Sequence, residues 1–341
     1  MKKNSFFHDL KLFPKVDLHR HLEGSVWPET FIEVSKKYGG NLPSYDLDKL
    51  RPMLQTNTGI HDFKNFLSRF RIFREFYESS DAIQAITYKA VKDASLDNVK
   101  YLELRFSPTH FAVHKKFNEE DVILWIKEAI EKASKEFNII VTPILTISRD
   151  FGVDLAEKTV MLALNMQDKF FCGLDIAGDE ISNSAGPFSG LFEIVKKSGL
   201  GLTIHAGEAG SSVNVKEAAE EYHADRIGHG IRSIENIKVM DLLREKNVML
   251  EVCITSNLHT GVVPSLKAHP VKQIKDSGVL FCLSTDDPAV SALCLTDEYC
   301  LAVSEFGFTE DDLKKMNLSA LDHSFYPDKN DLKKMLSAWW E

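Results

Sequence analysis

The chain has 341 residues, 44% of them hydrophobic and 27% charged, which is typical of a globular protein with a sizeable core. Its net charge of -9 and its lack of a basic cluster argue against a nucleic-acid partner, whose binding surfaces carry clustered Lys and Arg. No stretch approaches the roughly 18 apolar residues of a membrane span, and residues 1–10 lack the apolar segment of a signal peptide. Because the five cysteines show no CxxC spacing, we expect reduced thiols and a cytoplasmic protein; the oligomeric state stays open.

Short apolar runs alternate with amphipathic stretches along the chain. The expected strands are 16–21, 99–106, 138–146, 171–177, 201–205, 225–229, 248–253 and 279–284. Helix-like segments lie between most of them, at 119–136, 153–166, 188–198, 214–222, 234–246 and 296–306. This alternation indicates parallel strands joined by helical crossovers. Since every strand run is mostly apolar and none resembles an exposed edge, we predict one (β/α)8 TIM barrel over residues 1–341 rather than an open doubly wound sheet.

The first connection is much longer than a plain βα unit needs. It predicts a helical insertion at about 28–97, with helices at 28–38, 61–77 and 80–95. The helix at 61–77 carries phenylalanines at helical spacing: Phe63, Phe66, Phe70, Phe73 and Phe76. Two interpretations fit this pattern. The helix either packs onto the barrel or forms a lid with an apolar inner face.

Two histidines lie close together in the first expected strand. His19 and His21 are two residues apart, so their side chains point to the same face. At the C-terminal end of a barrel strand this face meets the pocket, where both imidazoles can ligate one Zn²⁺. Alone, the pair also fits two ordinary polar residues at a strand end.

Polar residues also follow the strands at 201–205 and 225–229. His205 closes its strand and Glu208 lies on the next loop, with Gly207 between them allowing a sharp turn. His229 stands between two glycines, which suggests a close approach of backbone. Each pattern taken singly also fits a turn with hydrogen-bonded polar groups.

The last strand is followed by adjacent carboxylates, Asp286 and Asp287, ahead of Pro288. Alone, they fit a helix N-cap with proline at the first helical position. Because adjacent side chains point in different directions, one can ligate a metal while the other contacts substrate. In a barrel the C-terminal strand ends converge on one pocket, so the histidines and carboxylates together predict a catalytic site there.

Six motifs of this sequence occur in the order found in adenosine deaminases. They are VDLHRHLEGS (16–25), YLELRFSP (101–108), GLDIAGDE (173–180), HAGE (205–208), RIGHG (226–230) and STDDP (284–288). The chain therefore resembles the adenosine deaminase family from residue 14 to about 290, and its tail resembles that family's closing helices. The resemblance implies hydrolytic deamination of a purine nucleoside, with one Zn²⁺ per chain.

The resemblance also implies roles for individual residues. The metal ligands would be His19, His21, His205 and Asp286, with a water as a further ligand. Glu208 would protonate N1 of the purine, while His229 and Asp286 would orient and deprotonate the water that attacks C6. The proton acceptor stays open between these two.

The substrate contacts implied by the resemblance involve four residues. Asp287 would contact N7, the backbone of Gly178 would approach N3, and His21 and Glu23 would also line the substrate. Glu23 stands where adenosine deaminases often have Asp, near the ribose 5′ hydroxyl. HLEG also occurs in relatives acting on adenine or aminodeoxyfutalosine, and the segment 253–261 differs from the animal enzymes.

We predict deamination of adenosine or 2′-deoxyadenosine, with another 6-aminopurine as the alternative: adenine, aminodeoxyfutalosine or a modified adenosine. Two other classes of protein fit the sequence less well. A binding protein that lost catalysis is disfavoured because all proposed ligands, the acid and the base are present. A two-metal hydrolase is disfavoured because no lysine lies at a suitable strand end.

Overall fold

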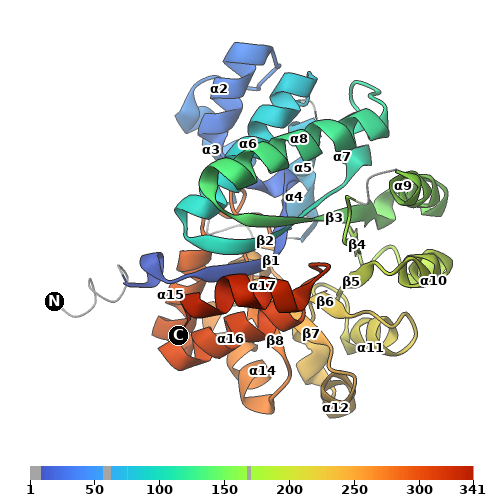
Figure 1. Cartoon of the computed structure of the whole chain (residues 1–341), viewed down its shortest axis with the longest axis vertical. Helices are drawn as coiled ribbons and strands as arrows, with labels where there is room; N and C mark the ends of the chain where they lie inside the picture. The colour runs from blue at the N-terminus through green and yellow to red at the C-terminus, as the bar shows by residue number, and fades with distance from the viewer. Residues whose placement is uncertain (1–8, 57–62, 75, 167–169, 341) are drawn as a thin grey trace.

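The computed structural model describes residues 9–56, 63–74, 76–166 and 170–340, and its strands form one eight-stranded parallel sheet in the order β1 to β8 (Figure 1). The strands are β1 Lys15–His21, β2 Val99–Phe106, β3 Ile140–Ser148, β4 Gly173–Ala177, β5 Gly201–Ala206, β6 Arg226–His229, β7 Met249–Val252 and β8 Phe281–Leu283. Each predicted strand is present, with ends shifted by at most two residues. The (β/α)8 barrel predicted from the alternating pattern is confirmed.

The barrel closes between β1 and the segment that follows β8. The backbone N–H of Asp286 donates to the carbonyl of His19 at 2.8 Å, and the N–H of His21 donates to the carbonyl of Asp286 at 2.9 Å. A parallel bridge pairs Arg20 with Asp286 between these bonds. Three of the residues predicted to bind metal thus also make the hydrogen bonds that join the first strand to the last.

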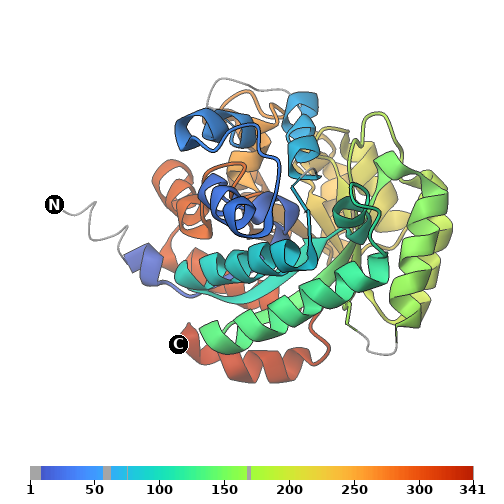
Figure 2. The same cartoon turned by 90° about the horizontal axis from the view of Figure 1, so that it is seen from above.

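The helices surround the sheet. After the first strand come α2 Pro28–Tyr38, α3 Leu47–Leu54, α4 Phe63–Ser68, α5 Phe70–Arg74 and α6 Ser80–Leu96. The crossovers contain α7 Pro108–Ala112, α8 Glu119–Phe137, α9 Val153–Asn165, α10 Ser189–Ser198, α11 Ser212–Glu220, α12 Ile237–Glu245, α13 Ile254–His259 and α14 Val271–Ser277. The chain closes with α15 Leu295–Phe306, α16 Glu310–Asp322 and α17 Lys329–Leu336. In Figure 2 the blue helices of the insertion lie together on one side of the barrel.

Local sequence sets where several of these helices start. Ser79 accepts a hydrogen bond from the N–H of Ala82 at the start of α6, and Asn118 accepts one from Glu120 at the start of α8. Such caps satisfy N–H groups that have no partner within the helix. At the other end of α8, Asn138 adopts a left-handed conformation (φ 51°), which stops the helix before β3.

The prediction of one continuous helix at 61–77 is wrong. The structure has two short helices, α4 and α5, with Arg69 between them; residues 61, 62 and 75 lie outside the described residues. The side chain of Arg69 is buried and donates to the carbonyls of Pro52 and Met53, both at 3.1 Å. These hydrogen bonds connect the break between α4 and α5 to α3, a contact that the sequence pattern did not reveal.

The barrel interior below the pocket is filled by charged side chains. Glu251 on β7 accepts hydrogen bonds from Arg105 at 2.8 Å and from Arg226 at 2.6 Å. Arg226 also pairs with Glu103, and Arg105 pairs with Asp175 at 3.2 Å. All five side chains are fully buried. Buried charges are stable only when each has a partner, so these strands must be held in one register.

No helix within the described ranges is long and apolar enough to cross a membrane. All five cysteines are free thiols, which agrees with the expectation of reduced cysteines.

We predict that Arg226→Met destabilises the protein by about 3–5 kcal/mol, because it leaves Glu103 and Glu251 without a buried partner. The check is the free energy of unfolding in urea. Lys272→Met is the control, since Lys272 forms an exposed pair with Asp276 that should contribute less than about 1 kcal/mol. Equal stability of the two variants would contradict the importance of the buried pairs.

Candidate active site

The predicted metal ligands meet at the C-terminal end of the barrel. Asp286 Oδ1 lies 3.1 Å from His19 Nε2 and 3.4 Å from His21 Nε2. His21 Nε2 lies 3.3 Å from His205 Nε2. Two overlapping groups of residues have potential ligand atoms within 4.8 Å of one another: His19, His205, His229 and Asp286, and His21, Asp175 and His205. The structure therefore brings together all four predicted ligands, and places His229 beside them.

Carboxylates behind two of the histidines fix where their protons lie. His19 Nδ1 is 2.7 Å from Glu251, and His205 Nδ1 is 2.8 Å from Asp175. Although burial opposes it, the adjacent guanidinium and imidazole groups lower the pKa of both carboxyls, so they are ionised and each Nδ1 must donate a hydrogen. In the neutral rings that metal binding requires, the two Nε2 atoms then present lone pairs to the centre of the site.

This arrangement fits a cation. The Nε2 lone pair of His19 faces the Asp286 carboxylate, and that of His205 faces the ring of His21. Facing lone pairs repel each other unless a positive ion lies between them. Three imidazole nitrogens and one carboxylate oxygen suit a divalent transition metal such as zinc, and carboxylates that hold the outer ring nitrogens are the usual support for such ligands.

Two site residues have unusual backbone conformations. His229 and Asp286 have φ angles of 60° and 59°, in the left-handed region that side chains rarely adopt. Each such residue costs about 1–3 kcal/mol and persists only where its surroundings hold it. Asp286 is held by the two backbone bonds that close the barrel, and these turn its side chain toward the histidines.

Glu208 lies in a buried environment next to His229, with its Oε2 atom 3.5 Å from His229 Nε2. Burial, reinforced by the charge of Asp286 and then by Glu180, raises its pKa well above the usual glutamate value. Burial thus favours the protonated form, and in that form Glu208 can act as an acid. The preceding Gly207 has a φ of 68°, and a Cβ there would lie 2.3 Å from Val215, so the sharp turn requires glycine.

Glu180 holds the loop that carries Glu208. Its carboxylate accepts the backbone N–H groups of Gly207 and Gly210, each at 2.8 Å, and that of Glu208 at 3.3 Å. A side chain at Gly210 would collide with Glu180, because its Cβ would lie 2.0 Å from Oε1. The GDE segment thus fixes the position of the HAGE segment.

The predicted substrate-contacting residues line the same pocket. Burial, followed by the charge of Asp286, raises the pKa of Asp287 well above its usual value, so this carboxyl can donate a hydrogen bond. Burial raises the pKa of Glu23 to about 7, although Glu23 accepts the N–H of Ser107 at 2.8 Å. Gly178 has a φ of 105°, and a Cβ there would lie 2.8 Å from Asp150.

This pocket has a volume of about 140 Å³ and mixed walls. Its polar wall includes His21, Glu23, Gly178, His205, Glu208, His229, Asp286 and Asp287. The apolar part of the lining comes largely from α4 and α5, which contribute Phe63, Phe66, Leu67 and Phe70. Phe73 and Phe76 from the same predicted stripe pack instead against Phe31, at centroid distances of 5.2 and 4.2 Å. The aromatic stripe therefore serves both the pocket and the core.

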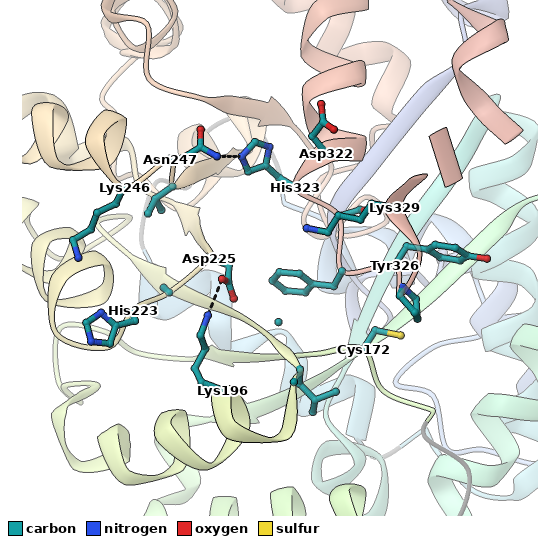
Figure 3. A pocket seen from close by; sticks show the side chains of 18 of the residues that line it. Cys172, Lys196, His223, Asp225, Lys246, Asn247, Asp322, His323, Tyr326 and Lys329 are labelled. Atoms are coloured by element: carbon teal, nitrogen blue, oxygen red, sulfur yellow. Dashed lines mark hydrogen bonds and ion pairs between the residues drawn. The ribbon is translucent and has the colours of Figure 1, made fainter. Parts of the chain in front are cut away.

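A larger cavity of about 770 Å³ lies away from these residues, around the N-terminal ends of β5 to β7 (Figure 3). Its polar groups are partly paired: Lys196 forms an ion pair with Asp225 at 2.7 Å, and Asn247 Nδ2 lies 3.0 Å from His323 Nε2. No metal-binding group is found there among the described residues. In barrels of this kind catalytic groups lie at the opposite end, so size alone does not mark the site.

Several supporting residues were missed by the sequence analysis. Asp175 and Glu251 hold the histidines from behind, Glu180 holds the Glu208 loop, and Ser256 donates to Asp286 Oδ2 at 2.6 Å. The available signal was a charged residue inside an apolar strand, as in GLDIA and MLEV. A buried charge at such a position needs a partner inside the barrel.

The sequence and fold were compared with known proteins. The family model described as "Adenosine deaminase" matches residues 14–338. An adenosine deaminase from Aliivibrio fischeri is 36% identical over 319 residues, which cover 94% of this chain and 96% of the relative.

Two crystal structures share the fold at 24% identity and a TM-score of 0.88. One is the adenine deaminase of Arthrobacter aurescens, with 96% of this chain and 98% of that one covered. The other is an amidohydrolase from Burkholderia ambifaria with bound Zn, with 98% and 91% covered.

Proposed function

This chain belongs to the adenosine deaminase family, and from that premise we propose that it hydrolyses adenosine and 2′-deoxyadenosine to inosine and 2′-deoxyinosine with release of ammonia. The observation that carries the proposal is the convergence of three histidines and Asp286 beside a buried glutamate, Glu208, whose pKa is raised well above its usual value. Residues 1–341 act as a single domain in this proposal, and the cytoplasmic location stays a prediction.

One Zn²⁺ per chain would be held by His19, His21, His205 and Asp286. Their ligand atoms face one another, whereas His229 Nε2 lies further from Asp286, at 3.9 Å from Oδ2. When bound, zinc supplies a positive charge that lowers the pKa of a water toward about 7.

Side chains of the protein would carry out two proton transfers, one to the purine and one from the attacking water. Glu208 donates its proton to N1 of the purine, which makes C6 electrophilic toward water. His229 lies next to both Glu208 and Asp286, and His229 and Asp286 orient the water, with one of the two taking its proton. Adenosine and water are thereby converted to inosine and ammonia.

The remaining contacts orient the base and the sugar. Asp287 carries a proton and suits N7, which is a hydrogen-bond acceptor. The left-handed turn at Gly178 exposes backbone to N3, and Glu23 reaches the sugar with an oxygen, Oε2, that has no hydrogen-bond partner among the described residues. His21 lies at the edge of the same pocket.

The charge of the pocket favours a nucleoside over a nucleotide. Among the described lining residues, Glu23, Asp150, Glu208, Asp286 and Asp287 carry carboxyl groups, while Arg74 carries the guanidinium. Arg74 already donates to His110 Nδ1 at 3.2 Å. No second Lys or Arg is among the described lining residues, so the pocket offers a phosphate little cationic support and an uncharged 6-aminopurine nucleoside fits better.

The purified protein should convert adenosine to inosine, followed by the change in ultraviolet absorbance, and a zinc chelator should abolish the conversion. Restoring zinc should restore it. No conversion by protein that contains zinc would contradict adenosine as the substrate. A panel of adenine, aminodeoxyfutalosine and modified adenosines then identifies the alternative 6-aminopurine.

Glu208→Gln should lower kcat by about 10²–10⁴-fold while the protein keeps its zinc, because Gln cannot donate the acidic proton. In the native protein, activity should persist well above the pH at which an ordinary glutamate ionises and fall as Glu208 loses its proton. Glu221→Gln, at an exposed position, is the control. Unchanged turnover in Glu208→Gln would remove Glu208 from the mechanism.

The helical insertion at 28–97 forms a cover over the substrate in this proposal, with Phe63 and Phe66 on its inner face. Phe63→Ala and Phe66→Ala should each raise KM for adenosine several-fold, since each removes apolar surface from the bound base. Leu96→Ala, at a residue exposed at the end of α6, is the control. If KM stays at the native value in both variants, these side chains do not cover the substrate.

A further inference from the structure

His229 is connected to a chain of buried polar side chains that the proposed mechanism does not use. In this series of side chains, His229 contacts Asn257 on α13, and Asn257 in turn contacts His269, which precedes α14. Asn257, His229 and His269 have exposed fractions of 0%, 1% and 4%. Three polar side chains this deeply buried need fixed hydrogen-bond partners.

The direction of the hydrogen bonds is set at His269. The backbone N–H of Val271 donates to His269 Nδ1 at 3.2 Å. Val271 is the first residue of α14, where an N–H group has no partner within the helix. A backbone N–H can only donate, so Nδ1 must accept. Burial also lowers the pKa of His269 to about 3, so the neutral ring carries its hydrogen on Nε2.

The hydrogen bond from His269 fixes the orientation of the Asn257 side-chain amide, and this amide in turn contacts His229. His269 Nε2 lies 3.2 Å from Asn257 Oδ1 and therefore donates to it. With its oxygen turned to His269, the amide places Nδ2 3.1 Å from His229 Nδ1. The amide nitrogen can only donate, so Nδ1 of His229 is an acceptor. The backbone of Val271 thus determines the orientation of the Asn257 amide.

We propose that Asn257 and His269 are positioning residues that fix the tautomer of His229, so that its hydrogen lies on Nε2 and points into the active site. His229 Nε2 is 3.5 Å from Glu208 Oε2 and 3.9 Å from Asp286 Oδ2. His229 therefore offers the site a hydrogen-bond donor and no lone pair. Of the two candidate proton acceptors, this leaves Asp286, whose Oδ2 also accepts from Ser256.

The catalytic consequence rests on the proposed function, whereas the tautomer itself does not. A donor aimed at the attacking oxygen orients it without competing for its proton. Loss of one such fixed donor typically lowers turnover by about 10²–10³-fold. Asn257 and His269 touch neither substrate nor metal in this arrangement, so their effect must pass through His229.

The test is Asn257→Asp in the zinc-loaded enzyme. Aspartate has nearly the same shape but only accepts, so His229 Nδ1 must then carry a hydrogen. Nitrogen-15 NMR of labelled histidine, with the His229 signals identified by comparison with His229→Gln, reads which ring nitrogen is protonated. We expect Nε2–H in the native enzyme, a hydrogen on Nδ1 in the variant, and a fall in kcat of about 10²-fold with little change in KM.

A pair of His269 variants gives a second measurement if Asn257→Asp folds poorly. His269→Gln keeps an N–H donor for Asn257 and should keep the native His229 tautomer and most of kcat. His269→Leu removes the donor, frees the amide to turn, and should lower kcat. Asn236→Asp is the matched control, since Asn236 caps α12 at the surface and aspartate caps equally well.

Two results would overturn the proposal. One is a hydrogen on Nδ1 of His229 in the native enzyme. The other is an unchanged tautomer and kcat in Asn257→Asp or in His269→Leu. Native enzyme that contains zinc but leaves adenosine intact would contradict the proposed function instead, and the NMR measurement would still decide the tautomer.

Discussion

The buried carboxylate of Glu251 connects the stability of this barrel to its chemistry. It accepts from Arg105 and Arg226 below the pocket and from His19 Nδ1 above it. Because these partners come from strands β1, β2 and β6, their relative register is fixed by one residue on β7. A carboxylate buried this deeply is tolerated only while all its partners stay in place. The same contacts direct the Nε2 lone pair of His19 to the candidate metal position.

The closure of the barrel also links the stability of the fold to the active site. The backbone bonds between β1 and Asp286 close the barrel at the residues proposed to hold zinc. They also hold Asp286 in its left-handed conformation. A metal bound there would bridge the first and last strands, so binding and closure would support each other. The high cost of the left-handed backbone is offset by contacts that the fold itself supplies.

Protons in the site are controlled by burial and by fixed hydrogen bonds. Burial raises the pKa of Glu208 and of Asp287, which favours the protonated, hydrogen-donating form of these two carboxyl groups beside the ionised Asp286. Asp175 and Glu251 hold hydrogens on the outer nitrogens of two histidines. At His229 the arrangement is the opposite: Asn257, oriented by His269, donates to the outer nitrogen Nδ1, so the ring hydrogen lies on Nε2. His19 and His205 thus present Nε2 lone pairs to the active site, whereas the neighbouring His229 presents an Nε2–H group.

The sequence alone determined the order of strands and the end of the barrel at which chemistry occurs, because alternating apolar runs and polar residues after strands are local patterns. His19, His21, His205, Glu208, His229, Asp286 and Asp287 could all be found in this way. The break between α4 and α5 could not, because the buried Arg69 forms its contacts with a distant helix. The partners Asp175, Glu251, Glu180, Asn257 and His269 were likewise decided only by tertiary structure. Their roles depend on which strands and helices become neighbours, and on hydrogen-bond directions that no spacing along the chain contains.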